Sequence, residues 1–327
     1  MKILVTGGAG YIGSVVVDHL LKQNYQLVCL DRLSFGIESI KNLQAHENFK
    51  LEKFDIRETD KLSKLLETSK FEAVIHLAAI VGDPACTLYS KETQEINIDA
   101  TKILINLSRK YNVRKFIFAS TCSNYGKMKD SSKYVNEKSD LKPLSLYAKS
   151  KVEIEKYILN DLDKSEDFEP TILRFATVYG ISHRMRFDLT INQFVKDAFY
   201  NKRLIIYGEN FWRPYCHVDD FANAFTRILT SSENVSYNVF NVGDTKENYS
   251  KKMIAELILE RVPSLKIEYV LKKDDPRDYK VNSDKIKNLL NFKISKTVTN
   301  GIDEIILYLQ NKKCNDTYQQ KYYNTPI

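Results

Sequence analysis

The amino-acid sequence predicts an α/β protein, with a doubly wound parallel sheet and a smaller α+β lobe. Over the first half of the chain, short β-rich runs alternate with amphipathic helical segments. This alternation is the pattern of a parallel sheet covered by helices on both faces. The rhythm breaks after Gly180, which indicates a second structural unit. The length of 327 residues, 43% of them hydrophobic, is enough for one large α/β domain or two modest ones.

The expected strands of the main sheet are short runs rich in β-branched and other apolar residues. In chain order they are Lys2–Thr6, Gln26–Leu30, Phe49–Lys53, Ala73–Leu77, Lys115–Ser120, Pro170–Phe175 and Tyr237–Val242. Helical segments lie between them, and each repeats its apolar residues at helical spacing. These segments are Ser14–Lys22, Glu92–Tyr111 and Tyr147–Leu162.

The chain after Gly180 supplies the expected lobe. A basic stretch at residues 182–186 is followed by a helical segment over about Leu189–Tyr200, and short strands are expected at Leu204–Tyr207 and Lys266–Val270. The domain boundaries follow: residues 1–180 with about 218–246 form the larger domain, and about 181–217 with 247–310 form the lobe. Residues 311–327 are a polar, tyrosine-rich tail, for which disorder and a role as an oligomer arm are both open.

Composition argues against nucleic-acid and membrane partners. The net charge of +7 comes from dispersed lysines interrupted by acids, without a basic face carrying aromatic platforms. The longest apolar runs, such as Val74–Leu77, are too short to span a bilayer, and the sequence opens without the apolar region of a signal peptide. We therefore expect a cytoplasmic protein. The five cysteines are scattered without metal-ligand spacing, so we expect reduced, packed thiols and no metal site.

A glycine-rich turn follows the first expected strand and opens a helix. Gly7 allows a tight turn, Gly10 lets the backbone approach a diphosphate, and Gly13 lets the helix pack closely on the sheet. Tyr11 and Ile12 lie at the start of that helix, whose free N–H groups and dipole favour phosphate. The turn alone has a purely structural alternative. In this context it predicts a Rossmann-type dinucleotide site.

Residues at the ends of the next strands support the same site. Asp31 ends the second strand, where an acid binds the ribose hydroxyls and repels a 2′-phosphate, so NAD is favoured over NADP. Arg32 next to it is the feature that would instead suit a 2′-phosphate. Asp55 and Ile56 follow the third strand, where an acid can pair with the adenine amino group. The fourth strand ends at Leu77, Ala78 and Ala79, where the small alanines leave room for the cofactor.

Tyr147 and Lys151 are four residues apart on an expected helix, so they lie on one face, one turn apart. An ammonium near a phenol favours the phenolate and lowers a pKa that is normally about 10. Such a tyrosine can take a proton from a sugar hydroxyl as hydride leaves the carbon. A surface pair is the usual explanation of this spacing, but behind a dinucleotide motif we predict a catalytic pair.

On these motifs the chain resembles the extended short-chain dehydrogenase/reductases, in the nucleotide-sugar epimerase/dehydratase family. The resemblance also rests on Asn97, Ser120–Gly126, Arg174–Gly180 and Arg213–Asp219. It implies that NAD takes hydride from C4 of a nucleoside-diphosphate sugar, with Tyr147 taking the hydroxyl proton. It further implies that Thr121 hydrogen-bonds that hydroxyl with Ser123 nearby, and that Asn97 braces the backbone.

The departures from the family pattern reduce the number of reactions that the chain could catalyse. Dehydratases of this family carry an Asp-Glu pair where this chain has Cys122 and Ser123, which argues against dehydration. A nucleotide-sugar 4-epimerase in cell-surface polysaccharide synthesis is the leading hypothesis, and a C4 dehydrogenase releasing a 4-keto sugar is the alternative. A C3/C5 epimerase or reductase using Cys122 is a further alternative, although a packed cysteine is the default. A non-catalytic NAD-binding regulator is the rival from another class.

The resemblance also implies contacts to the sugar nucleotide. Arg213 and, by a looser match, Arg277 are expected to grip the diphosphate, since a planar guanidinium suits phosphate oxygens. Arg186 is a candidate phosphate or sugar contact, and Asp83 either binds sugar hydroxyls or caps a helix. Thr177 stands where many relatives have asparagine. His217 is expected to be packed rather than catalytic, and the family's homodimer or a higher homo-oligomer is expected through the helices at about Glu92–Tyr111 and Tyr147–Leu162.

Overall fold

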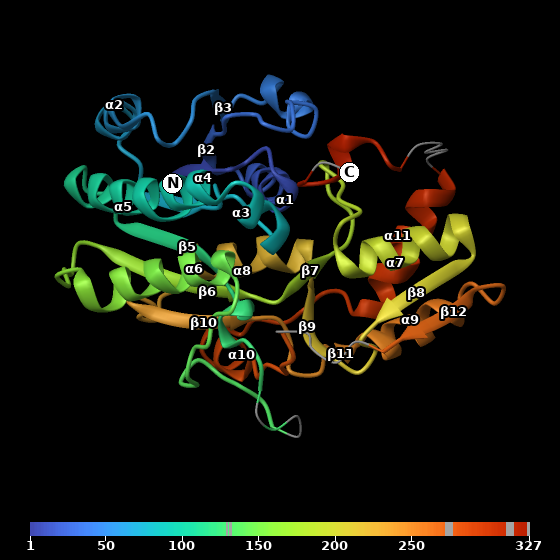
Figure 1. Cartoon of the computed structure of the whole chain (residues 1–327). Helices are drawn as coiled ribbons and strands as arrows, with labels where there is room; N and C mark the ends of the chain where they lie inside the picture. Colours follow the sequence, from blue (N-terminus) through green and yellow to red (C-terminus); the bar gives the residue numbers. More distant parts are fainter. Residues whose placement is uncertain (129, 131–132, 272–276, 312–316, 326–327) are drawn as a thin grey trace.

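The computed structural model describes residues 1–327 except 129, 131–132, 272–276, 312–316 and 326–327. Its main element is a seven-stranded, fully parallel sheet with the order β10-β6-β5-β4-β1-β2-β3 (Figure 1). The strands are β1 (Lys2–Thr6), β2 (Gln26–Leu30), β3 (Phe49–Glu52), β4 (Ala73–His76), β5 (Lys115–Thr121), β6 (Glu169–Phe175) and β10 (Asn238–Val242). All seven expected strands are present, each within a residue or two of its expected bounds.

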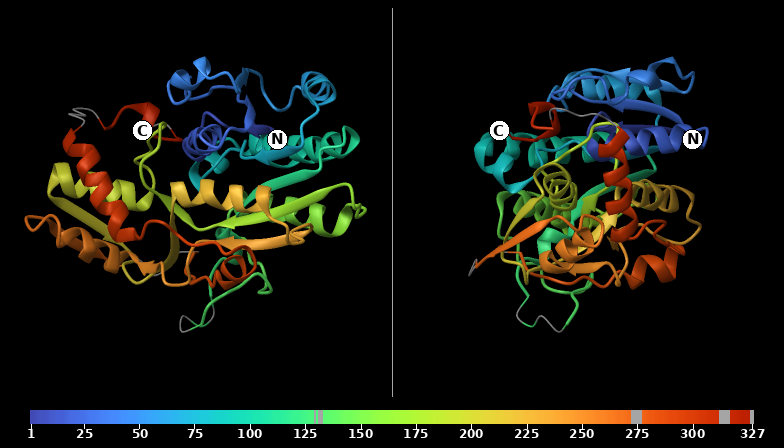
Figure 2. Two further views of the ribbon diagram at one scale, coloured as in Figure 1. Left: turned by 180° about the vertical axis from the view of Figure 1, so that it is seen from behind. Right: turned by 90° about the vertical axis from the view of Figure 1, so that its right-hand side faces the viewer.

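Helices cover both faces of this sheet, as the alternation predicted (Figure 2). Within β1, Ile3 and Val5 belong to the core on one face and Leu4 to the core on the other, because successive side chains of a strand point in opposite directions. The first core holds α1 (Tyr11–Leu21) and α8 (Val218–Thr230). The second holds α2 (Thr59–Ser69), α5 (Thr101–Lys110) and α6 (Leu146–Lys156).

The strand order reverses between β1 and β4, which are hydrogen-bonded neighbours. The chain builds β1, β2 and β3 outward on one side, and β4, β5 and β6 on the other. Ligands of open α/β sheets bind outside the carboxyl ends of the strands at such a switch point. The residues that follow β1, β2, β4 and β5 are therefore the ones to inspect for a site.

The lobe contains strands that the sequence did not predict. A three-stranded sheet joins β11 (Asn248–Ser250), β9 (Trp212–His217) and β7 (Thr177–Tyr179). The expected strands β8 (Arg203–Tyr207) and β12 (Lys266–Val270) pair with each other. Helices α7 (Thr190–Asn201), α9 (Lys251–Leu259) and α11 (Val298–Asn311) complete the lobe, with α10 (Asp284–Leu290) beside β10 (Figure 1). The division into two domains stays a prediction.

The expected long helix over Glu92–Tyr111 is interrupted. Helix α4 (Ser90–Gln94) and α5 are joined by one turn of π-helix at Glu95–Ala100, and a similar turn at Tyr157–Asp161 ends α6. A short helix α3 (Asp83–Leu88) precedes α4. Among the described residues, no helix combines the length and the apolar character needed to cross a membrane. Cys29, Cys86, Cys122 and Cys216 are buried thiols, whereas Cys314 lies outside the described residues.

The tail is not a projecting arm where the structure describes it. Residues 317–325 return to the body and pack on α7 and the loop before it, through the short helix η5 (Gln320–Tyr322) (Figure 1). The Phe187 amide donates to the Tyr322 carbonyl at 3.1 Å, and the two rings meet edge to face. Residues 317–325 are therefore packed on their own chain, and a role of the tail in an oligomer stays a prediction.

His76, the last residue of β4, hydrogen-bonds β1 and α5, and its burial predicts how the stability of the protein depends on pH. Its ring is 1% exposed and bonds Thr6 Oγ1 at 2.7 Å and Thr101 Oγ1 at 2.9 Å. Burial lowers the pKa of His76 from 6.5 to about 3. The unfolded chain therefore binds a proton between pH 6.5 and 3 that the folded chain does not, so stability is lost as the pH falls through this window.

We expect the His76→Gln variant to show a shallower loss of stability in acid than the wild type. From pH 6.5 to 5, the free energy of unfolding of the wild type should fall by about 2 kcal/mol more, at about 1.4 kcal/mol per pH unit and proton. Urea unfolding across this range measures the difference. Parallel pH profiles of the two proteins would contradict the assignment of this acid sensitivity to His76.

Candidate active site

The glycine turn between β1 and α1 is built by close backbone contacts. Gly7 has φ +73°, and a Cβ there would lie 2.7 Å from the Ala78 backbone nitrogen. A Cβ on Gly13 would lie 2.1 Å from the Gly7 carbonyl oxygen. Gly10 is the N-cap of α1 without a side-chain cap, and the first turn holds no acid. The helix start thus offers backbone N–H groups to an anion, as the sequence predicted.

Asp31 lies at the rim of this turn. One carboxylate oxygen accepts from the Ala9 amide at 3.0 Å and the other from the Leu33 amide at 2.7 Å. Burial raises the pKa of Asp31 above its usual value, against the effect of these hydrogen bonds. The carboxylate is fixed in orientation, with a lone pair left on each oxygen for ribose hydroxyls.

Asp55 is more occupied than the sequence suggested. The Arg57 guanidinium donates to both of its oxygens at 3.0 Å, and Arg32 Nη1 donates at 3.3 Å. Although burial opposes it, these guanidinium bonds lower the pKa of Asp55 to about 2. A contact with adenine at Asp55 would share oxygens that already accept bonds. Arg32 also pairs with Glu92 at 3.3 Å, so acids engage the guanidinium that would have suited a 2′-phosphate.

The segment after β4 runs close to the glycine turn. The Leu77 amide donates to the Thr6 carbonyl at 3.1 Å, and the Ala78 amide to Thr6 Oγ1 at 3.3 Å. Asn97 then holds Ile80 from both sides, since its Oδ1 accepts from the Ile80 amide at 2.8 Å and its Nδ2 donates to the carbonyl at 2.9 Å. Asn97 thus braces the backbone, in the role that the family resemblance implied.

Tyr147 and Lys151 lie on α6, which starts at the N-cap Ser145. Lys151 is 4% exposed, and its ammonium lies 4.7 Å from the Phe118 ring centroid and 5.9 Å from the Tyr147 ring centroid. Thr121 at the end of β5 is buried, and its Oγ1 accepts from the Ser123 amide at 3.1 Å. No hydrogen-bond partner of the Tyr147 hydroxyl is found among the described residues.

The charges in this site differ from the sequence expectation in one respect. Burial raises the pKa of the Tyr147 phenol, with Cys86 and Asp83 adding to the rise, and Arg186 is the cation that opposes it. Burial also lowers the pKa of Lys151 from 10.5 to about 8. The prediction that Lys151 lowers the pKa of Tyr147 is therefore wrong for this structure, because both groups are desolvated together.

A buried ionic network joins α6 to β5 and β6, and the sequence analysis missed it. Arg174 donates twice to Glu155 Oε2, at 2.6 and 3.1 Å, and once to Oε1 at 3.0 Å. Glu155 Oε1 also accepts from Ser120 and from Asn124 Nδ2. Glu155 and Arg174 are 1% and 3% exposed. The signal was available, because Glu155 is four residues beyond Lys151 and Arg174 lies inside a hydrophobic strand.

Cys122 and Ser123 lie beside this network. The Cys122 thiol is 1% exposed and donates to the Arg174 carbonyl at 3.2 Å, and burial raises its pKa. It is a packed thiol, which was the default interpretation. Ser123 Oγ accepts from the Tyr279 hydroxyl at 3.4 Å.

The predicted substrate residues come together from both halves of the chain, but most already have partners. Arg277 Nη1 pairs with Asp83 Oδ2 at 3.1 Å. The N-cap of α3 is Gly82, so the alternative that Asp83 caps this helix is wrong. Arg186 binds Asp188 through two 2.8 Å bonds. Arg213 is 7% exposed, donates to the Trp212 carbonyl at 2.7 Å and lies 5.3 Å from the Tyr279 ring centroid. Thr177 is half-buried in β7, paired with Tyr215 of β9.

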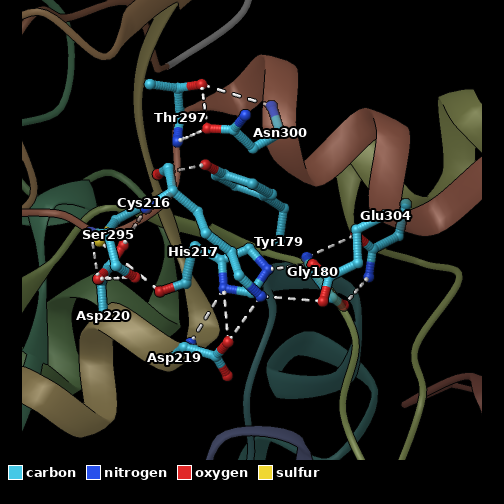
Figure 3. A network of polar contacts seen from close by, with 12 residues as sticks. Tyr179, Gly180, Cys216, His217, Asp219, Asp220, Ser295, Thr297, Asn300 and Glu304 are labelled. Atoms are coloured by element: carbon cyan, nitrogen blue, oxygen red, sulfur yellow. Dashed lines mark hydrogen bonds and ion pairs between the residues drawn. The ribbon is translucent and has the colours of Figure 1, made fainter.

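His217 is a fully buried structural residue (Figure 3). Its Nδ1 accepts from the Asp219 amide at 3.2 Å, and its Nε2 contacts Glu304 Oε2 at 2.6 Å. A Cβ on Gly180 would lie 2.2 Å from His217 Nε2. Three possible metal-ligand atoms gather here, but the Lys296 ammonium already bonds the two carboxylates of this group, Asp219 at 2.8 Å and Glu304 at 3.0 Å. The prediction that His217 is packed is confirmed.

A second buried hub joins the glycine turn to the lobe. The Tyr11 hydroxyl donates to the Gly180 carbonyl at 2.6 Å. Asn192 is fully buried and donates to the Tyr11 hydroxyl at 3.2 Å and to the Arg186 carbonyl at 3.0 Å, while it accepts from the Gly180 amide at 3.1 Å. The start of α1 and the loop that carries Arg186 are thus held by one side chain.

Comparisons with known proteins show which family has this sequence and this fold. The model of the NAD dependent epimerase/dehydratase family matches residues 3–243. A UDP-glucuronate 4-epimerase of Thermodesulfobacterium geofontis is 31% identical over 318 residues, 93% of this chain and 94% of that protein. A dTDP-D-glucose 4,6-dehydratase of Dictyostelium discoideum is 32% identical over 271 residues, 77% of this chain and 61% of that protein. The structure of a Bacillus cereus UDP-glucuronic acid 4-epimerase with UDP-glucuronic acid and NAD is 28% identical, with a TM-score of 0.82 over 95% of this chain and 99% of that one.

The buried ion pair gives a stability prediction. We expect Glu155→Ala to reduce the free energy of unfolding by about 3–5 kcal/mol, because Arg174 would remain buried without its carboxylate. Chemical denaturation measures the loss. The matched control is Glu169→Ala, whose partner Arg114 is an exposed arginine, and it should cost less than about 1 kcal/mol. Equal effects of the two substitutions would contradict the importance of the buried network.

Proposed function

Because the chain belongs to the NAD-dependent epimerase/dehydratase family, we propose that it oxidises C4 of a nucleoside-diphosphate sugar and acts as a 4-epimerase. One observation carries the proposal: Tyr147 and Lys151 lie one turn apart on α6, which packs against β5, and β5 ends at Thr121 in the sheet whose strand order reverses between β1 and β4. The pathway we have in mind is cell-surface polysaccharide synthesis.

The residues at this edge of the sheet fit NAD, because Gly10 caps α1 without a side chain and the first turn of α1 holds no acid, so the helix start is available to a diphosphate. We propose that NAD is held by residues at the ends of the first four strands and by the catalytic lysine. These are Gly7, Gly10, Tyr11, Ile12, Gly13, Asp31, Asp55, Ile56, Leu77, Ala78, Ala79 and Lys151. When bound, the oxidised nicotinamide supplies a hydride acceptor.

The protein side chains handle the proton. In our proposal Tyr147 takes the proton of the C4 hydroxyl, and Thr121 orients that hydroxyl by a hydrogen bond. Lys151 keeps positive charge near the phenol and holds the nicotinamide ribose. Burial raises the pKa of the Tyr147 phenol. The phenol would therefore have to lose its own proton to solvent before it acts as the base, and the positive charge of a bound nicotinamide ring would favour that ionisation.

The loop after β5 favours epimerisation over the other family reactions. Cys122 and Ser123 provide no carboxylate for elimination of water. The buried Cys122 thiol, held on the Arg174 carbonyl, does not supply a base for C3 or C5. A 4-epimerase needs no further acid or base, because hydride returns to the other face of the same carbon.

Residues of the lobe and the facing loops would bind the substrate. We assign Arg213 and Arg277 to the diphosphate, and Asp83, Ser123, Thr177 and Arg186 to the sugar side. The Asp83–Arg277 and Arg186–Asp188 pairs support a role at the cleft, since each holds a guanidinium in a fixed orientation.

The test is turnover of UDP-, GDP- and dTDP-sugars with analysis of both products and cofactor. We expect the C4 epimer to form without net NADH, and Tyr147→Phe to reduce kcat by about 100-fold or more while NADH still binds, since general acid–base catalysis contributes that much. A 4-keto product with stoichiometric NADH would identify the C4 dehydrogenase instead. Absence of turnover with every sugar, together with unchanged NADH binding in Tyr147→Phe, would support a non-catalytic regulator.

We also propose a homodimer formed through α5 and α6. Ile103 on α5 is partly exposed and is not packed against the core cluster of that face. A cytoplasmic location stays a prediction from the sequence.

Light scattering should give about twice the chain mass of 38.0 kDa for the wild type. The Ile103→Asp variant should shift toward the monomer, because an interface core does not accommodate an unpaired carboxylate. Leu307→Asp, at an exposed apolar position of α11, is the control and should leave the mass unchanged. A wild-type mass of one chain would contradict the proposed dimer.

A further inference from the structure

The loop before α7 contains a buried arginine with an unusual environment. Arg184 is 7% exposed, and its guanidinium lies 3.6 Å from the centroid of the Phe35 ring. Its Nη1 donates to Asn324 Oδ1 at 2.7 Å and its Nη2 to the Tyr323 carbonyl at 3.3 Å. Both acceptors are uncharged and belong to the carboxyl-terminal segment 317–325, which Figure 1 shows beside this loop.

Arg184 has no carboxylate partner within ion-pair distance among the residues that the structure describes. The charges of Asp188 and Asp31 act on it from farther away. The Asp188 carboxylate already accepts two hydrogen bonds from Arg186. The Arg184 Nε is buried without any hydrogen-bond partner. Burial lowers the pKa of Arg184 to about 10, so the charged form is held at a cost that a nearby anion would offset.

The position of the loop that carries Arg184 indicates which anion would offset the cost of burying its charge. The Ser182 hydroxyl donates to the Tyr11 carbonyl at 2.6 Å, and Ser182 Oγ lies 3.2 Å from Ser14 Oγ, so the loop lies against the first turn of α1. Phe35, on the other side of the guanidinium, follows the ribose acid Asp31 along the chain. Arg184 therefore lies between the ribose end of the cofactor site and the helix start. The glycine turn itself, residues 7–14, contains no basic side chain to neutralise a diphosphate.

We propose that Arg184 binds the diphosphate of the dinucleotide cofactor and that the carboxyl-terminal segment holds it in place. Asn324 connects the loop that carries Arg184 to the segment after β4, since its side chain accepts from Arg184 and donates to the Val81 carbonyl at 3.4 Å. The backbone amide of Asn324 also donates to Asp188 Oδ2 at 3.2 Å. The inference rests on the NAD cofactor of the proposed function and is independent of which sugar is turned over.

The test compares cofactor fragments in fluorescence titration of NADH and in competition by ADP-ribose and adenosine. Arg184→Gln should raise the Kd of NADH and of ADP-ribose by about tenfold to a hundredfold, the effect of losing a charged hydrogen bond. The Kd of adenosine, which lacks the diphosphate, should change less than about twofold. Asn324→Ala should give a smaller rise, and adding it to Arg184→Gln should have little further effect because both act through one contact.

Arg203→Gln is the matched control, because Arg203 is an exposed arginine of the lobe that pairs with Glu268 at 2.7 Å. It should leave all three Kd values unchanged. Thermal unfolding of each variant without ligand separates loss of binding from loss of folding. If Arg184→Gln is folded and binds NADH and ADP-ribose as the wild type does, the inference is overturned. It is also overturned if the variant loses affinity for NADPH alone or for nucleoside diphosphates of the substrate alone. A wild type that binds no NADH would instead overturn the proposed function.

Discussion

The geometry around α6 depends first on the carboxylate of Glu155, a residue of this helix that is 1% exposed. A buried carboxylate is tolerated only when its oxygens are fully bonded. Arg174 of β6, Ser120 of β5 and Asn124 of the following loop supply those bonds. Because each donor comes from a different segment, the orientation of α6 relative to β5 is fixed within hydrogen-bond tolerance. Tyr147 lies two helical turns before Glu155, and Thr121 directly follows Ser120, so the same constraint sets their mutual geometry.

Desolvated cations distinguish the cofactor side of this site. Lys151 is buried against the Phe118 ring, and Arg184 against the Phe35 ring, in each case without an adjacent carboxylate within ion-pair distance among the residues described. Two other guanidinium groups of the proposed site pair with acids, Arg186 with Asp188 and Arg277 with Asp83. A cation stacked on an aromatic face is only partly compensated for lost hydration. The arrangement therefore retains positive potential where an anionic dinucleotide is proposed to bind, because no adjacent protein carboxylate among the described residues neutralises these two cations.

The sequence was sufficient for the main sheet and for the cofactor turn, because both depend on local signals. Apolar runs located the strands, and Gly7 and Gly13 are required by backbone contacts that no side chain could share. The sequence was insufficient where a role depends on which distant groups meet. The pairing of Asp83 with Arg277, the position of the tail and the pKa of Tyr147 all follow from tertiary structure. Strands β7 and β11 have three residues each, too few to show a period.

A single buried network couples the glycine turn to the loop that carries Arg184 and Arg186. Asn192 links the Tyr11 hydroxyl at the glycine turn to the backbone of Arg186, and His217 packs under Gly180 between α8 and α11. A movement of the loop that carries Arg184 and Arg186 would break buried hydrogen bonds at the cofactor turn. One network of buried hydrogen bonds therefore sets both the position of this loop and the position of the first turn of α1, so a substitution in either segment should change the other.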